Sequence, residues 1–183
     1  MLKELINKIQ SYSKDRNVPI ISNNTLYYLK QIITKHKPKY CLEIGSAVGY
    51  SLINIASEIN NRGGKIIGLE ISFPSYKTAL SNINQSGLNN INLYNMDFLE
   101  FPIDKLIIHK LDFVFIDAMK KQYLDYLYLI LPYMAKNSVI IMDDVIKFKH
   151  RMNQLYLFLD KNQINYSLNQ IDEDDGIITI IIN

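Results

Sequence analysis

The sequence predicts an α/β fold, in which helices cover both faces of one mostly parallel sheet that ends in an antiparallel hairpin. Short apolar runs alternate with helical patterns from residue 40 to about residue 160, which is typical of parallel strands joined by crossover helices. The last two apolar runs follow one another with no helix between them, so they should form the hairpin. A chain of 183 residues is large enough to bury one core, and we expect a single domain over residues 1–183.

Two helices should precede the sheet. Apolar residues recur at helical spacing near the N-terminus and predict an amphipathic helix over residues 2–14. After an interruption at Pro19, Ser22 is a suitable N-cap for a second helix that ends near His36. We expect these helices, which lie within residues 1–37, to pack on or near the functional site.

Seven strands and four further helices account for the remaining residues. The strands are expected at residues 40–44, 65–70, 91–94, 111–116, 138–142, 166–171 and 177–182. The helices are expected from about Gly49, from Pro74 to Ser86, over residues 122–134 and over residues 152–160. Doubly wound sheets bind ligands beyond the carboxyl ends of their strands, where the first and fourth strands diverge. Residues that follow these strand ends are therefore the first functional candidates.

The composition argues against several classes of protein. Apolar residues make up 48% and charged residues 21%, so intrinsic disorder is not expected. No apolar run approaches the roughly 18 residues of a membrane span, and the N-terminus has no signal-peptide core, so we expect no membrane association. The single cysteine, Cys41, cannot form an internal disulfide and favours a reducing compartment, hence the cytoplasm. A net charge of +2 is too small to imply a polyanionic partner.

The segment 43–51 ends the first strand and opens a helix, and it has the features of a ligand-binding loop. Gly45 permits a sharp turn, and Gly49 lets a ligand approach the helix N-terminus. Free amides there, together with Ser51, would hold a carboxylate, while Glu43 adds negative charge for an amino group. The dinucleotide pattern GxGxxG and the P-loop pattern are both absent. A tight strand–helix turn without a ligand is the alternative.

Acidic residues also end the neighbouring strands. Glu70 ends the second strand, where a carboxylate can accept hydrogen bonds from both ribose hydroxyls. Asp97 follows the third strand and could accept from an adenine amino group or simply cap a helix. Asp117 follows the fourth strand, and Asp143 and Asp144 follow the fifth. Three carboxylates so placed repel one another unless protonated or neutralised, so a hard divalent cation, Mg²⁺ above all, is expected. Strand-end acids without a metal are the alternative.

These motifs resemble the catechol and caffeoyl-CoA type of metal-dependent O-methyltransferases, which includes a bacterial O-methyltransferase family. The resemblance spans nearly the whole chain in the right order. It is carried by residues 18–22, 42–51, 67–70, 112–118, 120, 123, 143–145 and 175–176. It implies the Rossmann-like fold of class I methyltransferases and S-adenosylmethionine as the cofactor. The cofactor-binding residues would be Glu43, Gly45, Gly49, Ser51, Glu70, Asp97 and Asp117.

The resemblance also implies roles at the catalytic end. The family's Mg²⁺ positions are occupied here by Asp117, Asp143 and Asp144. Its catalytic positions are occupied by Asp117 and Lys120, and Lys120 would be the base. A hydroxyl bound to a divalent cation loses its proton more readily and is held in position. To accept that proton, Lys120 must be neutral part of the time.

Two departures from the family pattern bear on the acceptor and on the family's usual homodimer contacts. The family usually has asparagine where this chain has Asp144. Aspartate in place of asparagine keeps an oxygen ligand and adds a negative charge. The chain is also short for the family, and residues 145–150 lack the Trp and Gly often found there.

Three functions are consistent with these residues. The leading hypothesis is methyl transfer from S-adenosylmethionine to a metal-bound hydroxyl of a small catechol- or phenol-like acceptor. The second is O-methylation of a hydroxyuridine at the wobble position of a transfer RNA anticodon. A basic run of Lys147, Lys149, His150 and Arg151 would suit its phosphates. The third is a non-catalytic module that only binds the cofactor, against which the presence of Asp117, Asp143 and Lys120 argues.

Overall fold

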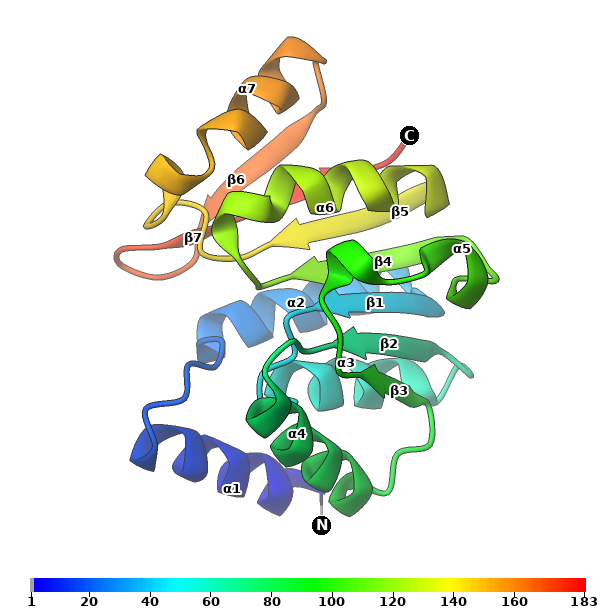
Figure 1. The fold of residues 1–183 in the computed structure, drawn as a ribbon, viewed down its shortest axis with the longest axis vertical. Coiled ribbons are helices and arrows are strands. Elements are labelled where there is room, and N and C mark those ends of the chain that lie inside the picture. The colour runs from blue at the N-terminus through cyan, green and yellow to red at the C-terminus, as the bar shows by residue number, and fades with distance from the viewer. Residues whose placement is uncertain (1) are drawn as a thin grey trace.

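One seven-stranded sheet organises residues 2–183, which are the residues that the computed structural model describes (Figure 1). Its strand order is β3-β2-β1-β4-β5-β7-β6. The strands are β1 (Tyr40–Ile44), β2 (Lys65–Leu69), β3 (Ile91–Tyr94), β4 (Leu111–Ile116), β5 (Met134–Met142), β6 (Tyr166–Gln170) and β7 (Gly176–Ile181). Strands β1 to β5 are parallel, and β7 pairs antiparallel with both β5 and β6. The predicted α/β sheet with its C-terminal hairpin is confirmed.

Apart from the end of α6, the helices lie where the sequence pattern predicts them, with one addition. They are α1 (Leu2–Asp15), α2 (Asn23–His36), α3 (Tyr50–Asn60), α4 (Phe73–Ser86), α5 (Ile103–Leu106), α6 (Tyr123–Ile130) and α7 (Asn153–Lys161). Ser22 caps α2 as expected, because its Oγ accepts a hydrogen bond of 3.0 Å from the backbone N–H of Thr25. The short helix α5 was not predicted, since four residues are too few to establish a helical period.

Two predicted boundaries near the end of the parallel sheet were wrong. Helix α6 ends at Ile130 instead of near residue 134, because Pro132 turns the chain into a short 3-10 helix, Leu131–Tyr133. Strand β5 begins at Met134, not at residue 138, and its pairing with β4 shifts register before Val139. Asn137, within this irregular stretch, has a φ of 63° in the left-handed region.

Two apolar cores hold the sheet from its two faces. Successive strand residues point to opposite faces, so Val114 and Ile116 of β4 join the core beneath α6 and α7. Phe113 and Phe115 join the other core, beneath α1 to α4. All four side chains are fully buried. The central strands are therefore held rigidly on both sides, which fixes the positions of the residues that follow them. Within residues 2–183, every helix is too short or too polar to cross a bilayer.

Gly45 lies where β1 leaves the sheet beside the end of β4. Its φ is +90°, and a Cβ atom there would overlap the backbone carbonyl oxygen of Asp117. Gly63 has a similar φ of +70°, but a Cβ atom there would meet no atom within 4 Å. A comparison of Gly45 with Gly63 therefore distinguishes the effect of a positive φ from the effect of close packing against Asp117.

We expect Gly45→Ala to lower the free energy of unfolding by more than about 3 kcal/mol, because strain in φ adds to the overlap with Asp117. Gly63→Ala should cost only about 1 to 2 kcal/mol, the strain in φ alone. Urea unfolding of both variants measures the difference. Equal losses would show that β1 and β4 do not need this close approach.

Candidate active site

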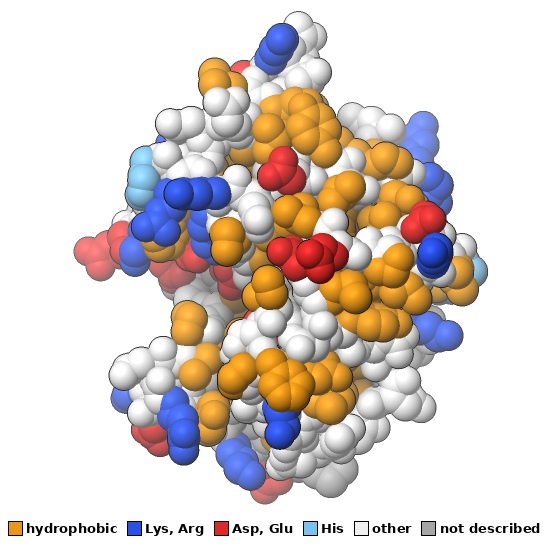
Figure 2. All heavy atoms as spheres, viewed as in Figure 1, with side chains coloured by type: hydrophobic (Ala, Val, Ile, Leu, Met, Phe, Trp, Pro, Cys, Tyr) orange, Lys and Arg blue, Asp and Glu red, His pale blue; other side chains and the backbone are white. Residues whose placement is uncertain are grey.

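A cavity of about 610 Å³ opens at the carboxyl ends of β1, β2, β4 and β5. Seven segments line it, and they include the turn before α2, the loop after β1 and the connection between β6 and β7. In Figure 2 a hollow with acidic side chains around it lies on the left of the molecule, where these strands end in Figure 1. The volume is in the range of small-molecule sites. The cavity therefore lies where the doubly wound sheet predicts a ligand.

Most of the predicted site residues line this one cavity. They are Gly45, Ser51, Glu70, Asp97, Asp117, Lys120, Asp143 and Asp144. Glu43 and Gly49 are not on its wall, because Glu43 is fully buried in β1 and Gly49 faces Ala79 of α4 at the start of α3. Residues 19–22 and Thr25 also line the cavity, so the N-terminal helical segment reaches the site.

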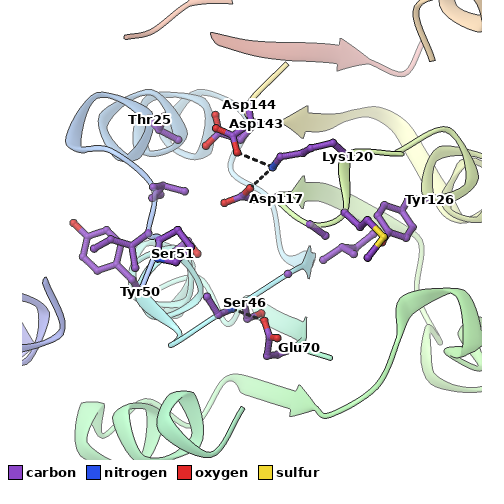
Figure 3. Close-up of a pocket in the computed structure, with 18 of the residues that line it drawn as sticks. Thr25, Ser46, Tyr50, Ser51, Glu70, Asp117, Lys120, Tyr126, Asp143 and Asp144 are labelled. Atoms are coloured by element: carbon purple, nitrogen blue, oxygen red, sulfur yellow. Dashed lines mark hydrogen bonds and ion pairs between the residues drawn. The ribbon is translucent and has the colours of Figure 1, made fainter. Parts of the chain in front are cut away.

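Lys120 lies between two of the three clustered carboxylates (Figure 3). Its Nζ is 2.7 Å from Asp117 Oδ1 and 2.8 Å from Asp144 Oδ2. Burial disfavours the charged ammonium, but Tyr123, Asp117 and Asp144 outweigh it and raise the pKa of Lys120 above its usual value. In this arrangement Lys120 is a cation. A role as a base therefore requires that it leave these carboxylates.

Asp143 is the most buried of the three acids, with only 7% of its surface exposed. Burial, and then the charges of Asp117 and Asp144, raise the pKa of Asp143 to about 8. When all three acids are ionised, the one ammonium of Lys120 leaves two negative charges uncompensated. Oxygen donors with this excess charge suit a divalent cation. As arranged here, however, no group of three or more His, Cys, Asp or Glu residues within positions 2–183 is poised to hold a metal.

Tyr123 links the strand ends that carry these acids. Its side chain is fully buried, and its hydroxyl accepts a hydrogen bond of 2.9 Å from Lys120 Nζ. The same hydroxyl lies 3.3 Å from the carbonyl oxygen of Ile116 and 3.1 Å from that of Asp143. Tyr123 therefore connects the ends of β4 and β5 to Lys120. The sequence motif contains Tyr123 but gives no sign of this role.

Glu70 and Asp97 both hold backbone amides as well as lining the cavity. Glu70 accepts hydrogen bonds of 2.7 Å from the N–H groups of Ala47 and Ser72, which fixes the loops after β1 and β2. Asp97 accepts from the N–H of Leu99 at 3.0 Å and caps a short 3-10 helix, Phe98–Glu100. Asp97 therefore caps a helix, which was one of its two predicted roles, and it also lines the cavity.

Glu43 supports the loop from beneath. It is fully buried, and its Oε1 accepts a hydrogen bond of 2.5 Å from Ser51 Oγ, whereas Oε2 has no partner within residues 2–183. Burial raises the pKa of Glu43 to about 8. Ser46, which the sequence analysis did not single out, lines the cavity with a buried hydroxyl that also has no partner there. That hydroxyl lies against β2, because a Cβ atom added at Gly68 would be 2.7 Å from Ser46 Oγ.

Comparison with known proteins identifies the family. The sequence model of a family described as O-methyltransferase matches residues 1–180. A flavonoid 3',5'-methyltransferase of Vitis vinifera is 28% identical over 152 residues, which are 80% of this chain and 63% of the relative. A caffeoyl-CoA O-methyltransferase of Medicago sativa is 30% identical over 119 residues, 60% of this chain and 46% of the relative. The chain thus spans less than two thirds of the length of these relatives.

Solved structures confirm the predicted fold class. An O-methyltransferase from Bacillus cereus, solved in complex with S-adenosylhomocysteine (SAH), superposes with a TM-score of 0.83 at 22% identity. The alignment covers 97% of this chain and 90% of that one. An SAH-bound methyltransferase from Podospora anserina gives a TM-score of 0.86 at 19% identity, covering 100% and 87%. The sheet is therefore the Rossmann-like sheet of class I methyltransferases.

We expect Glu43→Gln to change how stability depends on pH. The folded-state pKa of about 8 exceeds the ordinary value of 4.5, so Glu43 contributes stability below pH 4.5 that is lost as pH rises through 8. The glutamine variant lacks this loss. Urea unfolding at about pH 5 and about pH 9 should show that the variant gains stability relative to the native chain at the higher pH. Parallel pH profiles would refute the buried, neutral state of Glu43.

Proposed function

The chain belongs to the O-methyltransferase family, and from this premise we propose that it transfers a methyl group from S-adenosylmethionine to a hydroxyl oxygen of a small acceptor. The observation that carries the proposal is the shared cavity, which joins the loop after β1 to the acids that follow β4 and β5. In the transfer, the methyl carbon leaves the sulfonium sulfur and bonds to the acceptor oxygen. The hydroxyl proton passes to a base.

We propose that the cofactor lies along the β1, β2 and β3 ends of the cavity. Glu70 would accept the ribose hydroxyls, and Asp97 would accept from the adenine amino group. The loop that contains Gly45 and Ser46 would meet the methionine portion. The sulfonium would then face Asp117, whose carboxylate is attractive to a positive charge.

We propose that the acceptor hydroxyl enters beside Asp117, Lys120 and Asp143. Asp117, Asp143 and Asp144 would together hold a divalent cation, with Mg²⁺ as the expected ion. When bound, that cation would lower the pKa of the acceptor hydroxyl and orient it. Lys120 would have to release Asp144 or Asp117 to accept the hydroxyl proton at Nζ. Tyr123 would keep the lysine beside the acceptor while this happens.

A catechol- or phenol-like acceptor suits this arrangement best, because its hydroxyl is acidic enough to lose its proton when a bound cation lowers the hydroxyl pKa. The transfer RNA alternative receives no specific support. Lys147 already pairs with Asp174 at 2.7 Å, while Lys149 lies over the ring of Tyr156. A homodimer and a cytoplasmic location remain predictions from the sequence.

We expect Lys120→Ala to reduce transfer to a catechol by about 10²- to 10⁴-fold, since the variant has no group to take the proton. The matched control is Lys121→Ala, because Lys121 is the exposed neighbour and does not line the cavity. Its rate should stay within about twofold of the native rate. Equal rates in the two variants would remove Lys120 from the reaction.

Asp143→Ala should abolish transfer while it leaves most of the affinity for S-adenosylmethionine, because this acid lies on the acceptor side of the cavity. Addition of EDTA to the native chain should have the same effect. Methyl transfer from labelled cofactor, with and without the chelator, measures both. Full activity of Asp143→Ala in EDTA would contradict the proposed cation site.

A further inference from the structure

The connection between α1 and α2 forms part of the cavity wall. Residues 19–22 line the cavity, together with Thr25 in the first turn of α2. The apolar residues Leu5 and Ile9 of α1 belong to the same core as Tyr50, the first residue of α3. The helix α1 is therefore held against the element that follows the proposed cofactor loop, and the connection runs from α1 to the cavity.

Tyr50 lines the cavity, but its hydroxyl is directed elsewhere. The residue is only 2% exposed. Figure 3 shows the hydroxyl pointing away from Asp117 and Lys120. Within residues 2–183 this hydroxyl has one hydrogen bond, which it accepts at 2.7 Å from Gln10 Nε2 of α1. A buried tyrosine hydroxyl needs a partner, so the contact with Gln10 helps to fix the position of the Tyr50 ring.

The same amide group of Gln10 also holds the start of α2. Gln10 Nε2 lies 3.1 Å from Asn23 Oδ1, and Asn23 is the first residue of α2. An amide nitrogen of this kind carries two hydrogens, so it can donate to Tyr50 and Asn23 at once. Gln10 therefore joins α1 to the N-terminal ends of α2 and α3. Because Gln10 does not line the cavity, it can affect a ligand only through these partners.

We infer that Gln10 is a positioning residue for the cofactor, because it holds Tyr50 and the cavity-lining connection in place beside the methionine portion. This inference rests on the proposed function, in which the loop before α3 meets that portion. Without Gln10 this part of the wall should loosen, so that the bound cofactor dissociates more readily. The hydrogen bonds of Gln10 go to Tyr50 and Asn23 and not to Lys120, so the chemical step should change little.

Gln10→Ala removes both hydrogen bonds and leaves a good helix former in α1. Calorimetry with SAH should give a Kd that is raised about fivefold or more, since a hydrogen bond that supports the site is lost. The KM for S-adenosylmethionine should rise by a similar factor, while kcat changes by less than about twofold. A purely structural role would lower the free energy of unfolding and leave the Kd unchanged, and that result would refute the inference.

Asn7→Ala is the matched control. Asn7 lies three residues earlier on α1, is exposed and does not line the cavity. The variant therefore removes an amide from the same helix without a change at Tyr50. Its Kd for SAH should stay within about twofold of the native value. Equal increases in Asn7→Ala and Gln10→Ala would show that α1 acts as a whole, and would remove the specific role of Gln10.

Tyr50→Phe tests whether the effect passes through the tyrosine hydroxyl. It removes one of the two hydrogen bonds of Gln10 and keeps an aromatic ring in the core. We expect the Kd for SAH to rise about twofold or more. The double variant Gln10→Ala/Tyr50→Phe should bind SAH no more weakly than Gln10→Ala alone, because the shared bond is already lost. Effects that multiply in the double variant would contradict a path through this bond.

The native chain separates this inference from the proposed function. If the native chain binds SAH and Gln10→Ala binds it equally well, only the inference about Gln10 fails. If the native chain does not bind SAH, the proposed function fails, and the inference fails with it.

Discussion

The crowding of like charges at one edge of a parallel sheet is the constraint on which the site depends. Parallel strands present their carboxyl ends at the same edge of the sheet. The pairing of β4 with β5 therefore keeps Asp117, which follows β4, close to Asp143 and Asp144, which follow β5. Lys120 compensates one of these charges from the turn that follows Asp117. The rest of the excess makes the cavity attractive to positive groups such as a sulfonium or a divalent cation.

The fold withstands this repulsion because the strands that carry the acids are held on both sides. Their apolar residues are buried beneath helices on both faces of the sheet, and Tyr123 joins the ends of β4 and β5 from within. Gly45 lets β1 pass directly against Asp117. The stability of the two cores thus maintains an arrangement of charges that would otherwise spread apart.

The sequence predicted the sheet, the turn after β1 and the positions of the acids at the strand ends well, because apolar periodicity and strand ends are local features. The errors arose where contacts between residues far apart in the sequence determine the structure. The early start of β5 at Met134 depends on pairing with β4, and the pairing of Lys120 with Asp144 depends on the approach of two strand ends. The orphan hydroxyl of Ser46 and the hidden position of Glu43 likewise follow from packing across the loop.

We propose that this acidic cavity binds a cationic nucleoside. Calorimetry of the native chain with S-adenosylmethionine, and separately with SAH, tests it most directly. Both should bind once per chain, and added salt should weaken the sulfonium compound more than the thioether, because only the former carries the extra positive charge. Absence of binding, or the same salt dependence for both compounds, would show that the acidic cavity does not recognise the cofactor by its positive charge.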